Sequence, residues 1–334
     1  MTHTDSHPKS TSKRVLSGIR ATGRLHLGNY LGAVKGMLEL QDSAEYDTLY
    51  MVADVHTLTT PYEVEQLRTN RREVIVDYLA AGLDPQKSIL FQQADVNEHI
   101  ELAFYFSSVV SIARMQHLPT FKDKVKQHPD HATLALLNYP TLMASDILIY
   151  NAELVPVGKD QEPHLEVARE VARKMNDQYG TTFPEPQSFA TPGAYVPSLT
   201  GEGKMSKSVE GSFINLHDTI DDIRKKVRSV PTATEVGGEM APGVSALFSF
   251  VELLIPEEKS RFMDAYKDGS LRYVELKDTV AEAIAAELKP LQERRAELAA
   301  DPAYVDQVIR DGAEKARALA QTTVADVKQK LGLA

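Results

Sequence analysis

Residues 47–94 read DTLYMVADVHTLTTPYEVEQLRTNRREVIVDYLAAGLDPQKSILFQQA. Asp47–Val55 and Ser88–Ala94 are short apolar runs of the kind that form strands buried inside a sheet. Between them, Val64–Ala81 has the periodicity of a helix, which we expect to end at Gly82. A strand, a helix and a second strand joined by short turns form a βαβ unit. The sequence therefore predicts an α/β fold with a parallel sheet and helices on both of its faces.

The chain as a whole divides into an α/β part and a helical part. Within residues 14–210, Leu154–Val157 reads as a further short buried strand, and a long helix begins near Asp160. Residues 211–334 are helical in pattern almost throughout, which predicts a C-terminal all-helical domain. Residues 1–13 are polar and read as a disordered tail. We place the domain boundary near residue 210, between the α/β part and the helical part.

The composition of the 334-residue chain excludes several classes of protein. A hydrophobic content of 43% and a charged content of 25% are typical of a globular protein, and no apolar run approaches the roughly 18–20 residues of a membrane helix. The absence of cysteine excludes disulfides, thiolate nucleophiles and cysteine-bound metal centres. A net charge of −10 argues against electrostatic binding of nucleic acid over the whole surface. A local basic patch is still compatible with this charge. Residues 1–13 lack the apolar core of a signal peptide, so we expect a cytoplasmic protein.

A glycine-studded segment, SGIRATGRLHLGNY at residues 17–30, follows the first predicted strand and opens a helix. Backbone N–H groups and the helix dipole at such a turn attract phosphate. His26 and Asn29 are three residues apart and so share one face of the helix, and Gly28 between them allows a nucleotide to approach the backbone. The plainer interpretation is a glycine-rich turn that carries two polar residues on a helix surface.

A second segment, KMSKS at residues 204–208, lies on a predicted loop flanked by glycines. Lys204 and Lys207 are three residues apart, and two such lysines on a mobile loop can close on a departing pyrophosphate. There they would neutralise the negative charge that grows in the transition state. A solvated basic segment is the alternative, because short clusters of lysine are common on protein surfaces.

Together, HLGN at residues 26–29 and KMSKS at residues 204–208 resemble the two signatures of class I aminoacyl-tRNA synthetases, the first as a variant of HIGH. From about Val15 to the C-terminus, the chain resembles the bacterial tryptophanyl-tRNA synthetases. Further matching blocks are NYPTLMASDILIYNAELVPVGKDQEPHLE at residues 138–166, LKPLQER at 288–294 and DGAEKAR at 311–317. The resemblance implies a Rossmann-like nucleotide-binding domain and an ATP-dependent ligase that joins L-tryptophan to tRNA(Trp).

The implied reaction has two steps. The tryptophan carboxylate attacks the α-phosphate of ATP, to which Mg²⁺ is bound without dedicated protein ligands, and pyrophosphate leaves. A ribose hydroxyl at the 3′ end of the tRNA then attacks the activated carbonyl. The resemblance also implies a homodimer, with residues 97–145 as a helical dimerisation insertion, residues 201–211 as the loop that carries KMSKS, and residues 211–334 as the domain that reads the anticodon.

In this family, His26 and Asn29 would face the ATP phosphates and stabilise the five-coordinate α-phosphorus, without accepting a proton. Lys204 and Lys207 would bind the pyrophosphate, and Ser206 would add a hydroxyl donor. Of the remaining positions, Gly158 and Asp160 would meet the ribose and Val196 the adenine. The complete set that the resemblance implies for ATP is Arg20, Ala21, Thr22, Gly28, Asn29, Gly158, Lys159, Asp160, Val196, Lys204, Met205, Ser206, Lys207 and Ser208.

Selection of the amino acid is implied at Tyr139, Met143 and Asp146, whose spacing puts all three on one helical face. An apolar slot with one buried carboxylate suits an indole, because this flat ring has a single N–H donor. Asp146 would accept that N–H, and phenylalanine would leave the carboxylate unpaired, which can reject a ligand by ~10⁴-fold. The alternatives are a surface carboxylate at Asp146 and purely structural roles for Met143 and His56. Leu16, Gly18, His56, Val155 and Val157 would complete the slot, and Gln161 would meet the amino group.

Three positions depart from the family's pattern. Arg20-Ala21 stands where members often have Gln-Pro or Arg-Pro, Leu16 replaces a frequent aromatic residue, and Lys159 replaces a frequent acid. Rival interpretations therefore stay open: a tyrosyl-tRNA synthetase, a nucleotidyltransferase that uses no tRNA, or a weakly active or regulatory second copy of the synthetase.

A basic cluster in the helical part is a candidate for tRNA contact. Its members are Arg224, Lys225, Lys226 and Arg228. Three aspartates begin the same predicted helix, so the complementarity of charged residues with the helix dipole explains the cluster without any tRNA.

Overall fold

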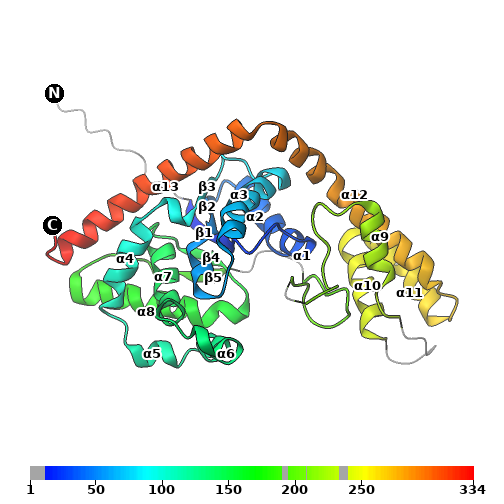
Figure 1. The fold of residues 1–334 in the computed structure, drawn as a ribbon, viewed down its shortest axis with the longest axis horizontal. Coiled ribbons are helices and arrows are strands. Elements are labelled where there is room, and N and C mark those ends of the chain that lie inside the picture. Colours follow the sequence, from blue (N-terminus) through cyan, green and yellow to red (C-terminus); the bar gives the residue numbers. More distant parts are fainter. Residues whose placement is uncertain (1–11, 190–194, 208, 233–239) are drawn as a thin grey trace.

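The computed structural model describes residues 12–189, 195–207, 209–232 and 240–334. Its centre is a sheet of five parallel strands in the order β3-β2-β1-β4-β5 (Figure 1). The strands are β1 (Lys13–Arg20), β2 (Tyr46–Ala53), β3 (Ile89–Gln92), β4 (Leu154–Pro156) and β5 (Gln187–Phe189). The parallel α/β sheet expected from the βαβ unit is confirmed.

The βαβ unit itself is shorter in its strands than the apolar runs suggest. β2 ends at Ala53 because Asp54 begins a 3-10 turn, its carboxylate accepting the next backbone N–H. β3 likewise gives way to a 3-10 turn after Gln92. The helix between them, α3, spans Val64–Ala81 as predicted. Gly82 ends it with a φ of 109°, a left-handed conformation that glycine adopts without strain.

The strand order places a topological switch point between β1 and β4. From β1 the chain proceeds outward to β2 and β3, and only afterwards crosses to β4 and β5 on the other side of β1. The register pairs Arg20 with Ala53 and Val15 with Leu154. In open parallel sheets, ligands bind in the crevice outside the carboxyl ends of the strands at such a point. We therefore expect the functional site beyond the ends of β1 and β4.

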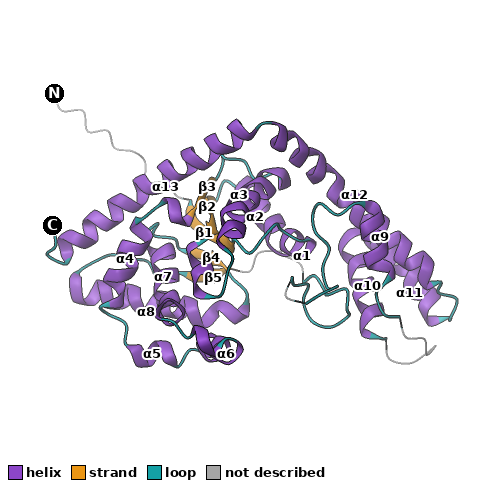
Figure 2. Ribbon diagram, viewed as in Figure 1, coloured by secondary structure: helices purple, strands orange, loops and turns teal. Residues whose placement is uncertain are grey.

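Helices cover both faces of the sheet and extend well beyond it (Figures 1 and 2). None in the described ranges is long and apolar enough to cross a membrane. In the α/β part they are α1 (Leu27–Asn29), α2 (Lys35–Asp42), α3, α4 (Glu98–Ser107), α5 (Ile112–Gln116), α6 (Pro119–Gln127), α7 (Leu134–Leu148) and α8 (Glu162–Tyr179), with a π-helical segment over Tyr30–Val34 that joins α1 to α2. After residue 210 they are α9 (Ile220–Arg228), α10 (Pro242–Leu254), α11 (Lys259–Lys267), α12 (Tyr273–Ala300) and α13 (Pro302–Lys330).

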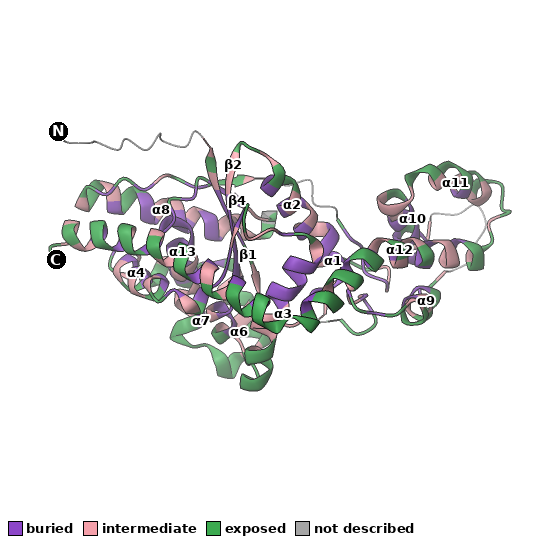
Figure 3. Cartoon of the chain, turned by 90° about the horizontal axis from the view of Figure 1, so that it is seen from above, coloured by how far each residue is buried: buried purple, intermediate pink, exposed green. Residues whose placement is uncertain are grey.

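The sheet separates two apolar cores, because successive residues of a strand point to opposite faces. Tyr50 and Val52 of β2 belong to the core under α2 and α3, which continues into α10 and α12. Leu49 and Met51 belong to the core under α4, α7 and α8. Figure 3 shows the buried residues concentrated along the strands and on the inner sides of these helices.

The helices after residue 210 do not pack as one separate unit. α12 packs against α9, α10 and also α3 of the α/β part, whereas α13 packs against β3 and α4. At its closest approach, the backbone of Gly312 in α13 lies against the carbonyl of Leu90, where a Cβ would come within 1.7 Å of the oxygen. We expected residues 211–334 to form one helical domain. α13 instead packs against the α/β part over its C-terminal half, where Ala316, Ala320, Val324 and Val327 are buried in the core that includes α4, whereas Val305 and Val308 lie in the core shared with α12.

Two further features differ from expectation: the start of the first strand and the presence of a fifth strand. The predicted tail of residues 1–13 includes Lys13, which is the first residue of β1, while residues 1–11 lie outside the described part of the chain. β5 falls in a stretch where the sequence indicates no strand, because its three residues Gln187–Phe189 include no apolar run.

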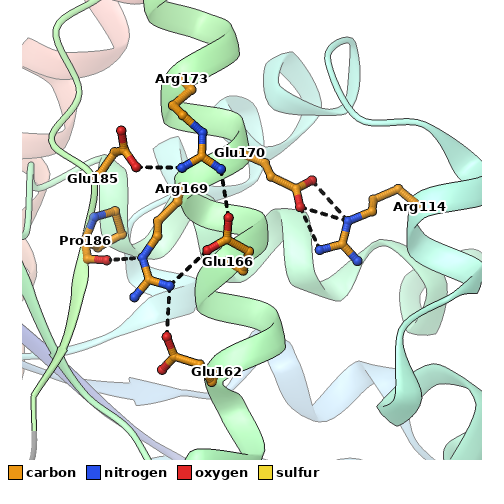
Figure 4. Close-up of polar contacts among 8 residues, drawn as sticks. All are labelled: Arg114, Glu162, Glu166, Arg169, Glu170, Arg173, Glu185 and Pro186. Atoms are coloured by element: carbon orange, nitrogen blue, oxygen red, sulfur yellow. Dashed lines mark hydrogen bonds and ion pairs between the residues drawn. The ribbon is translucent and has the colours of Figure 1, made fainter.

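The outer side of α8 carries a network of ion pairs (Figure 4). Arg169 pairs with Glu162 and Glu166 and donates to the carbonyl of Pro186. The other pairs join Arg173 to Glu166 and Glu185, and Arg114 of α5 to Glu170. Pairs at such exposed positions contribute little stability each, but together they tie α5 and the segment before β5 to α8.

Candidate active site

A cavity of about 420 Å³ opens at the switch point of the sheet. The end of β1, the turn after β2, one side of α7 and the segment between β4 and α8 line it. All nine residues that were predicted for the amino acid border this one cavity: Leu16, Gly18, His56, Tyr139, Met143, Asp146, Val155, Val157 and Gln161. The structure thus brings together side chains that the sequence separates by as many as 145 positions, from Leu16 to Gln161.

Asp146 borders the cavity, yet only 2% of its surface is exposed. Its Oδ2 lies 2.7 Å from Nε2 of His56, and its Oδ1 lies 2.6 Å from Nδ1 of His99 and 2.7 Å from Nε2 of Gln93. Burial by itself raises the pKa of Asp146, but the interactions with His56 and His99 outweigh burial and lower the pKa to about 2. The group is therefore an ionised carboxylate that can only accept hydrogen bonds. Its burial rules out the alternative of a surface carboxylate.

His164 of α8 organises three polar side chains that also border the cavity. Its Nδ1 lies 3.0 Å from Oε1 of Gln161, and its Nε2 faces the hydroxyls of Tyr139 and, at 2.8 Å, Thr120. Burial lowers the pKa of His164, so the ring is neutral. The single lone pair of Nε2 accepts a hydroxyl proton, so the ring proton lies on Nδ1 and is donated to Gln161. The amide oxygen of Gln161 is thereby fixed in place, with a second lone pair free for a ligand N–H.

Arg20, the last residue of β1, places a cation in the wall of the same cavity. Its Nη2 donates to the carbonyl of His56 at 3.2 Å and to the hydroxyl of Thr60 at 3.1 Å. Its Nε is buried and has no hydrogen-bond partner among the described residues, and burial lowers the pKa of Arg20. A partly desolvated guanidinium with an unused donor is suited to an anionic ligand group.

The HLGN turn is built by reciprocal hydrogen bonds between its first and last residues. Nδ1 of His26 accepts the N–H of Asn29 at 3.3 Å, and Oδ1 of Asn29 accepts the N–H of His26 at 3.2 Å. Because Nδ1 is an acceptor, the ring proton lies on Nε2. Burial, reinforced by the charges of Lys207 and Lys204, lowers the pKa of His26 to about 4. His26 is therefore a buried, neutral N–H donor, which argues against a turn with two polar residues on a helix surface.

The HLGN and KMSKS segments meet in the structure. Met205 is buried, and a Cβ on Gly28 would lie 3.1 Å from Cβ of Met205. Nζ of Lys207 donates to the carbonyl of Arg24 in the turn. Both Lys204 and Lys207 contribute to the lowered histidine pKa just described. The two lysines therefore gather at the turn, where phosphate binding was expected.

α12 braces the same turn from the helical part. The N–H of Leu216 donates to the carbonyl of Leu25 at 3.3 Å, and Gln292 of α12 donates to the carbonyl of Leu216 at 2.8 Å. On the other side, the carboxylate of Asp77 accepts the N–H of Leu25 at 2.7 Å and pairs with Nη1 of Arg295 at 2.9 Å. Burial raises the pKa of Asp77 to about 6 despite the attraction of Arg295.

The remaining residues predicted for ATP lie around these segments. Ala21 and Thr22 form the turn directly after β1, and Gly158 borders the cavity so closely to Asp160 that a Cβ would lie 2.6 Å from its carboxylate. The side chain of Val196 is fully buried in the core, and its carbonyl accepts the N–H of Met205 at 3.0 Å. Ser206 donates its N–H to Ser212 at 3.4 Å, whereas Ser208 and the side chain of Lys159 lie outside the described residues.

The basic cluster of α9 is largely engaged in ion pairs. A capping box between Thr219 and Asp222 begins the helix. The pairs are Arg224 with Asp221 and Glu282, Lys226 with Asp218, and Arg228 with Asp278. This arrangement favours the structural interpretation of the cluster, and its contact with tRNA stays a prediction.

Sequence reasoning missed the residues that hold the ligand-facing side chains in place. Gln93 and His99 reach Asp146, and His164 reaches Gln161. A usable signal existed for Gln93, because it follows β3 directly and so stands at the carboxyl end of a strand. His99 and His164 offered no signal beyond a helical position, since their partners come from other elements.

The chain resembles known proteins over nearly its whole length. A family model for tRNA synthetases class I (W and Y) matches residues 9–289. The chain is 43% identical over 326 residues to the tryptophan–tRNA ligase of Porphyromonas gingivalis, which covers 95% of this chain and 98% of that protein. Its structure resembles that of tryptophanyl-tRNA synthetase from Campylobacter jejuni complexed with ADP and tryptophan, with a TM-score of 0.85, 31% identity and coverage of 96% of this chain and 100% of that chain. The enzyme from Mycoplasma pneumoniae gives a TM-score of 0.82 at 30% identity, covering 97% and 98%.

These similarities extend over the α/β part and over the C-terminal helices alike. They confirm the resemblance that HLGN, KMSKS and the matching blocks indicated, and they set aside the tyrosyl and nucleotidyltransferase interpretations. The chain therefore belongs to the class I tRNA synthetases, in the family of the tryptophan–tRNA ligases.

Proposed function

We propose that the protein activates L-tryptophan with ATP and transfers it to tRNA(Trp), using the residues assembled around the cavity. The observation that carries the proposal is an ionised, buried carboxylate, Asp146, at a largely apolar slot whose wall also includes Arg20 at the end of β1. An indole needs one acceptor for its single N–H and apolar walls for its faces. Both needs are met by the same cavity.

The polar side chains of the cavity divide the amino acid between them. Asp146 accepts the indole N–H, while Gln161 and Tyr139, both held by His164, meet the ammonium group. Arg20 faces the carboxylate or the α-phosphate that the carboxylate attacks. Every polar group of tryptophan then has a partner, which is the condition for strong discrimination against other amino acids.

Activation needs positioning and charge neutralisation rather than a side-chain base, because the attacking carboxylate is already deprotonated. Its oxygen forms a bond to the α-phosphorus as the bond to the leaving pyrophosphate breaks. His26 donates its Nε2–H to the five-coordinate phosphorus group, and Asn29 fixes the His26 ring from behind. Lys204 and Lys207 neutralise the charge that grows on pyrophosphate.

Mg²⁺ would reach the site on the phosphates of ATP. This ion usually keeps several waters and binds through nucleotide phosphates rather than through a cage of side chains. In the described ranges, no three His, Asp or Glu side chains are grouped to hold a metal ion. When bound, the ion supplies further neutralisation of phosphate charge, and the two lysines bind the phosphate oxygens themselves.

The second step is attack by a ribose hydroxyl of tRNA(Trp) on the activated carbonyl. The helices after residue 210 would read the anticodon, and α12 links them to the HLGN turn through Gln292 and Arg295. We place the reaction in the cytoplasm, where tRNA and ATP meet, and fractionation of cells that express a tagged chain tests that location.

A homodimer formed through residues 97–145 is part of the proposal. Large apolar side chains are exposed on this segment, with Phe104 at 77% and Leu134 at 82%, and Ile100 and Ile112 nearby in sequence. A surface of this kind favours contact with a partner. Sedimentation should show a dimer that Phe104→Glu dissociates, while Val274→Glu, an exposed apolar position on α12, leaves it intact. A monomeric wild type at micromolar concentration would contradict the dimer.

The proposed function is tested by amino-acid-dependent exchange of labelled pyrophosphate into ATP. Tryptophan, tyrosine and phenylalanine are compared in the presence of Mg²⁺, and exchange is expected with tryptophan alone. Charging of tRNA(Trp) follows as the second readout. Silence with all three amino acids in folded protein would favour the weakly active or regulatory copy.

A further inference from the structure

Behind the cavity, buried side chains that do not border it form a series of hydrogen bonds that ends at the carboxylate of Asp146. His99, Gln93 and Tyr150 have no exposed surface, and none of the three borders the cavity. His99 lies between Asp146 and Tyr150. Its Nδ1 is 2.6 Å from Oδ1 of Asp146, and its Nε2 is 2.7 Å from the hydroxyl of Tyr150. Phe91 packs against the rings of His99 and Tyr150.

The hydrogen-bond partners assign the donor and acceptor roles among Tyr150, His99 and Asp146. Nε2 of His99 is the only hydrogen-bond partner that the described residues offer to the Tyr150 hydroxyl. Burial raises the pKa of Tyr150, so the hydroxyl keeps its proton and donates it to that nitrogen. The ring proton of His99 therefore lies on Nδ1, where it is donated to Asp146.

Counting acceptor positions then shows what remains for a ligand. A carboxylate offers about four lone-pair positions, two on each oxygen. His99 and Gln93 occupy both positions of Oδ1, and His56 occupies one position of Oδ2. One acceptor position is left, and it lies on Oδ2, the oxygen that His56 contacts from the wall of the cavity.

We propose that His99 is a positioning residue that saturates Oδ1 and so holds Asp146 with a single acceptor turned to the ligand ring. The inference rests on the proposed function, because it assigns a specificity device to the same slot. A single free acceptor on Asp146 limits the slot to ligand rings that carry one N–H donor. Without His99, Oδ1 regains a free acceptor and the carboxylate is free to rotate away from the ring.

The test compares L-tryptophan with 3-benzothienylalanine, in which sulfur replaces the indole N–H at nearly the same shape. Affinities are measured by calorimetry in the absence of ATP. Because the chain contains 13 tyrosines but no tryptophan, the fluorescence of the tryptophan ligand offers a second readout when it is excited at wavelengths that tyrosine does not absorb. Wild-type protein is expected to prefer tryptophan, since only tryptophan can use the remaining acceptor.

His99→Leu should weaken tryptophan binding by about tenfold to 100-fold, the effect of losing a hydrogen bond to a charged group. Binding of 3-benzothienylalanine should change little. His99→Asn keeps an N–H donor near the position of Nδ1 and should restore most of the preference. Tyr150→Phe removes only the hydroxyl that sets the proton on His99, and should give a smaller loss confined to tryptophan. If His99→Leu does not fold, these two variants carry the test.

Phe91→Leu is the matched control, because it loosens the packing around His99 without removing a hydrogen bond to Asp146. It should weaken both ligands equally. Equal losses for both ligands in the His99 and Tyr150 variants would show a merely structural role and overturn the proposal. A wild type that binds both ligands equally would also overturn it, while tryptophan-dependent exchange in the same protein would leave the proposed function standing.

Discussion

Gly28 of the HLGN turn lies directly against Met205 of KMSKS, so that a Cβ on Gly28 would stand 3.1 Å from Cβ of Met205 and 2.9 Å from the ring of His26. Two segments almost 180 residues apart in the sequence are therefore in van der Waals contact. The contact leaves no room for a side chain between His26 and the KMSKS loop.

Gly28→Ala should displace either the His26 ring or the KMSKS loop. A shift of about 1 Å in a catalytic group can lower kcat by about 100-fold, and we expect a loss of that order in pyrophosphate exchange. Gly28 is buried, so the added methyl group should also lower the melting temperature, but the loss of exchange should exceed any loss of folded protein at the assay temperature. Gly203→Ala, at a glycine with no atom near its Cβ position, separates loop strain from contact with the HLGN turn. Wild-type exchange in Gly28→Ala would contradict the close contact.

His26 should act through its N–H and not as a base. His26→Ala is expected to lower kcat by roughly 10²–10³-fold, the usual effect of losing one donor that stabilises transition-state charge. His26→Gln keeps an N–H near the position of Nε2 and should recover part of that loss. Steady-state exchange at saturating ATP measures both variants. Equal inactivity of Ala and Gln would argue for a role that only an imidazole can perform.

His164 should matter to the amino group of the ligand and not to its ring. His164→Leu frees Gln161 and Tyr139 from their shared partner, and tryptophan should bind about tenfold more weakly, as expected for loss of a net hydrogen-bond contribution. Indole-3-propionate, which lacks the amino group, should bind as it does to wild type. Calorimetry with the two ligands decides the matter, and a matched loss for both would point to general damage to the cavity.

Stability should decline toward acid pH in part through His26. Its pKa in the fold is about 4, below the usual 6.5, so between these values the unfolded chain binds a proton that the folded chain does not. The free energy of unfolding therefore falls as pH decreases through this window. Urea unfolding at several pH values should show a shallower decline for His26→Gln. Substitution of His131, an exposed histidine, should leave the slope unchanged, and an unaltered slope in His26→Gln would refute the assignment.

Arg295→Met should destabilise the protein more at pH 8 than at pH 5. The pKa of Asp77 in the fold is about 6 against a usual 3.8, so stability from this group is full below about pH 4 and is lost as pH rises through 6. Without Arg295 the buried carboxylate loses its cation, which costs about 3–5 kcal/mol when it is charged and less when protonation neutralises it. Arg294→Met, an exposed neighbour on α12, is the control. Equal losses at both pH values would contradict this coupling.

Much of the fold followed from local pattern. The boundaries of α3 were predicted correctly because the apolar spacing and Gly82 are both local signals. β5 was missed because a three-residue strand with exposed side chains carries no such signal. The apolar stripe of α13 predicted a buried face, but a stripe does not say which surface covers it, and the actual surface lies more than 150 residues earlier in the sequence.

The candidate site divides in a similar way. The nine residues expected to bind the amino acid were predicted because the resemblance supplied them position by position, although their gathering at one cavity depends on the sheet order. The supports behind them were not predicted. His99 is 47 residues from Asp146 in sequence, and a hydrogen bond over that distance depends on how α4 packs against α7. Helical periodicity predicts only that such a histidine is buried.

The packing of α13 on β3 has a consequence for the order of events during synthesis. Among the described strands β3 pairs with β2 alone, so its other edge can pair with any strand that approaches until a helix covers it. That helix begins at Pro302, about 210 residues after the end of β3, and so is made much later than the strand that it covers. The outer edge of the sheet therefore stays uncovered while residues 93–301 are synthesised. A fragment that ends before Pro302 would expose the unpaired edge of β3. We expect such fragments to aggregate, even though they contain every residue of the amino-acid cavity.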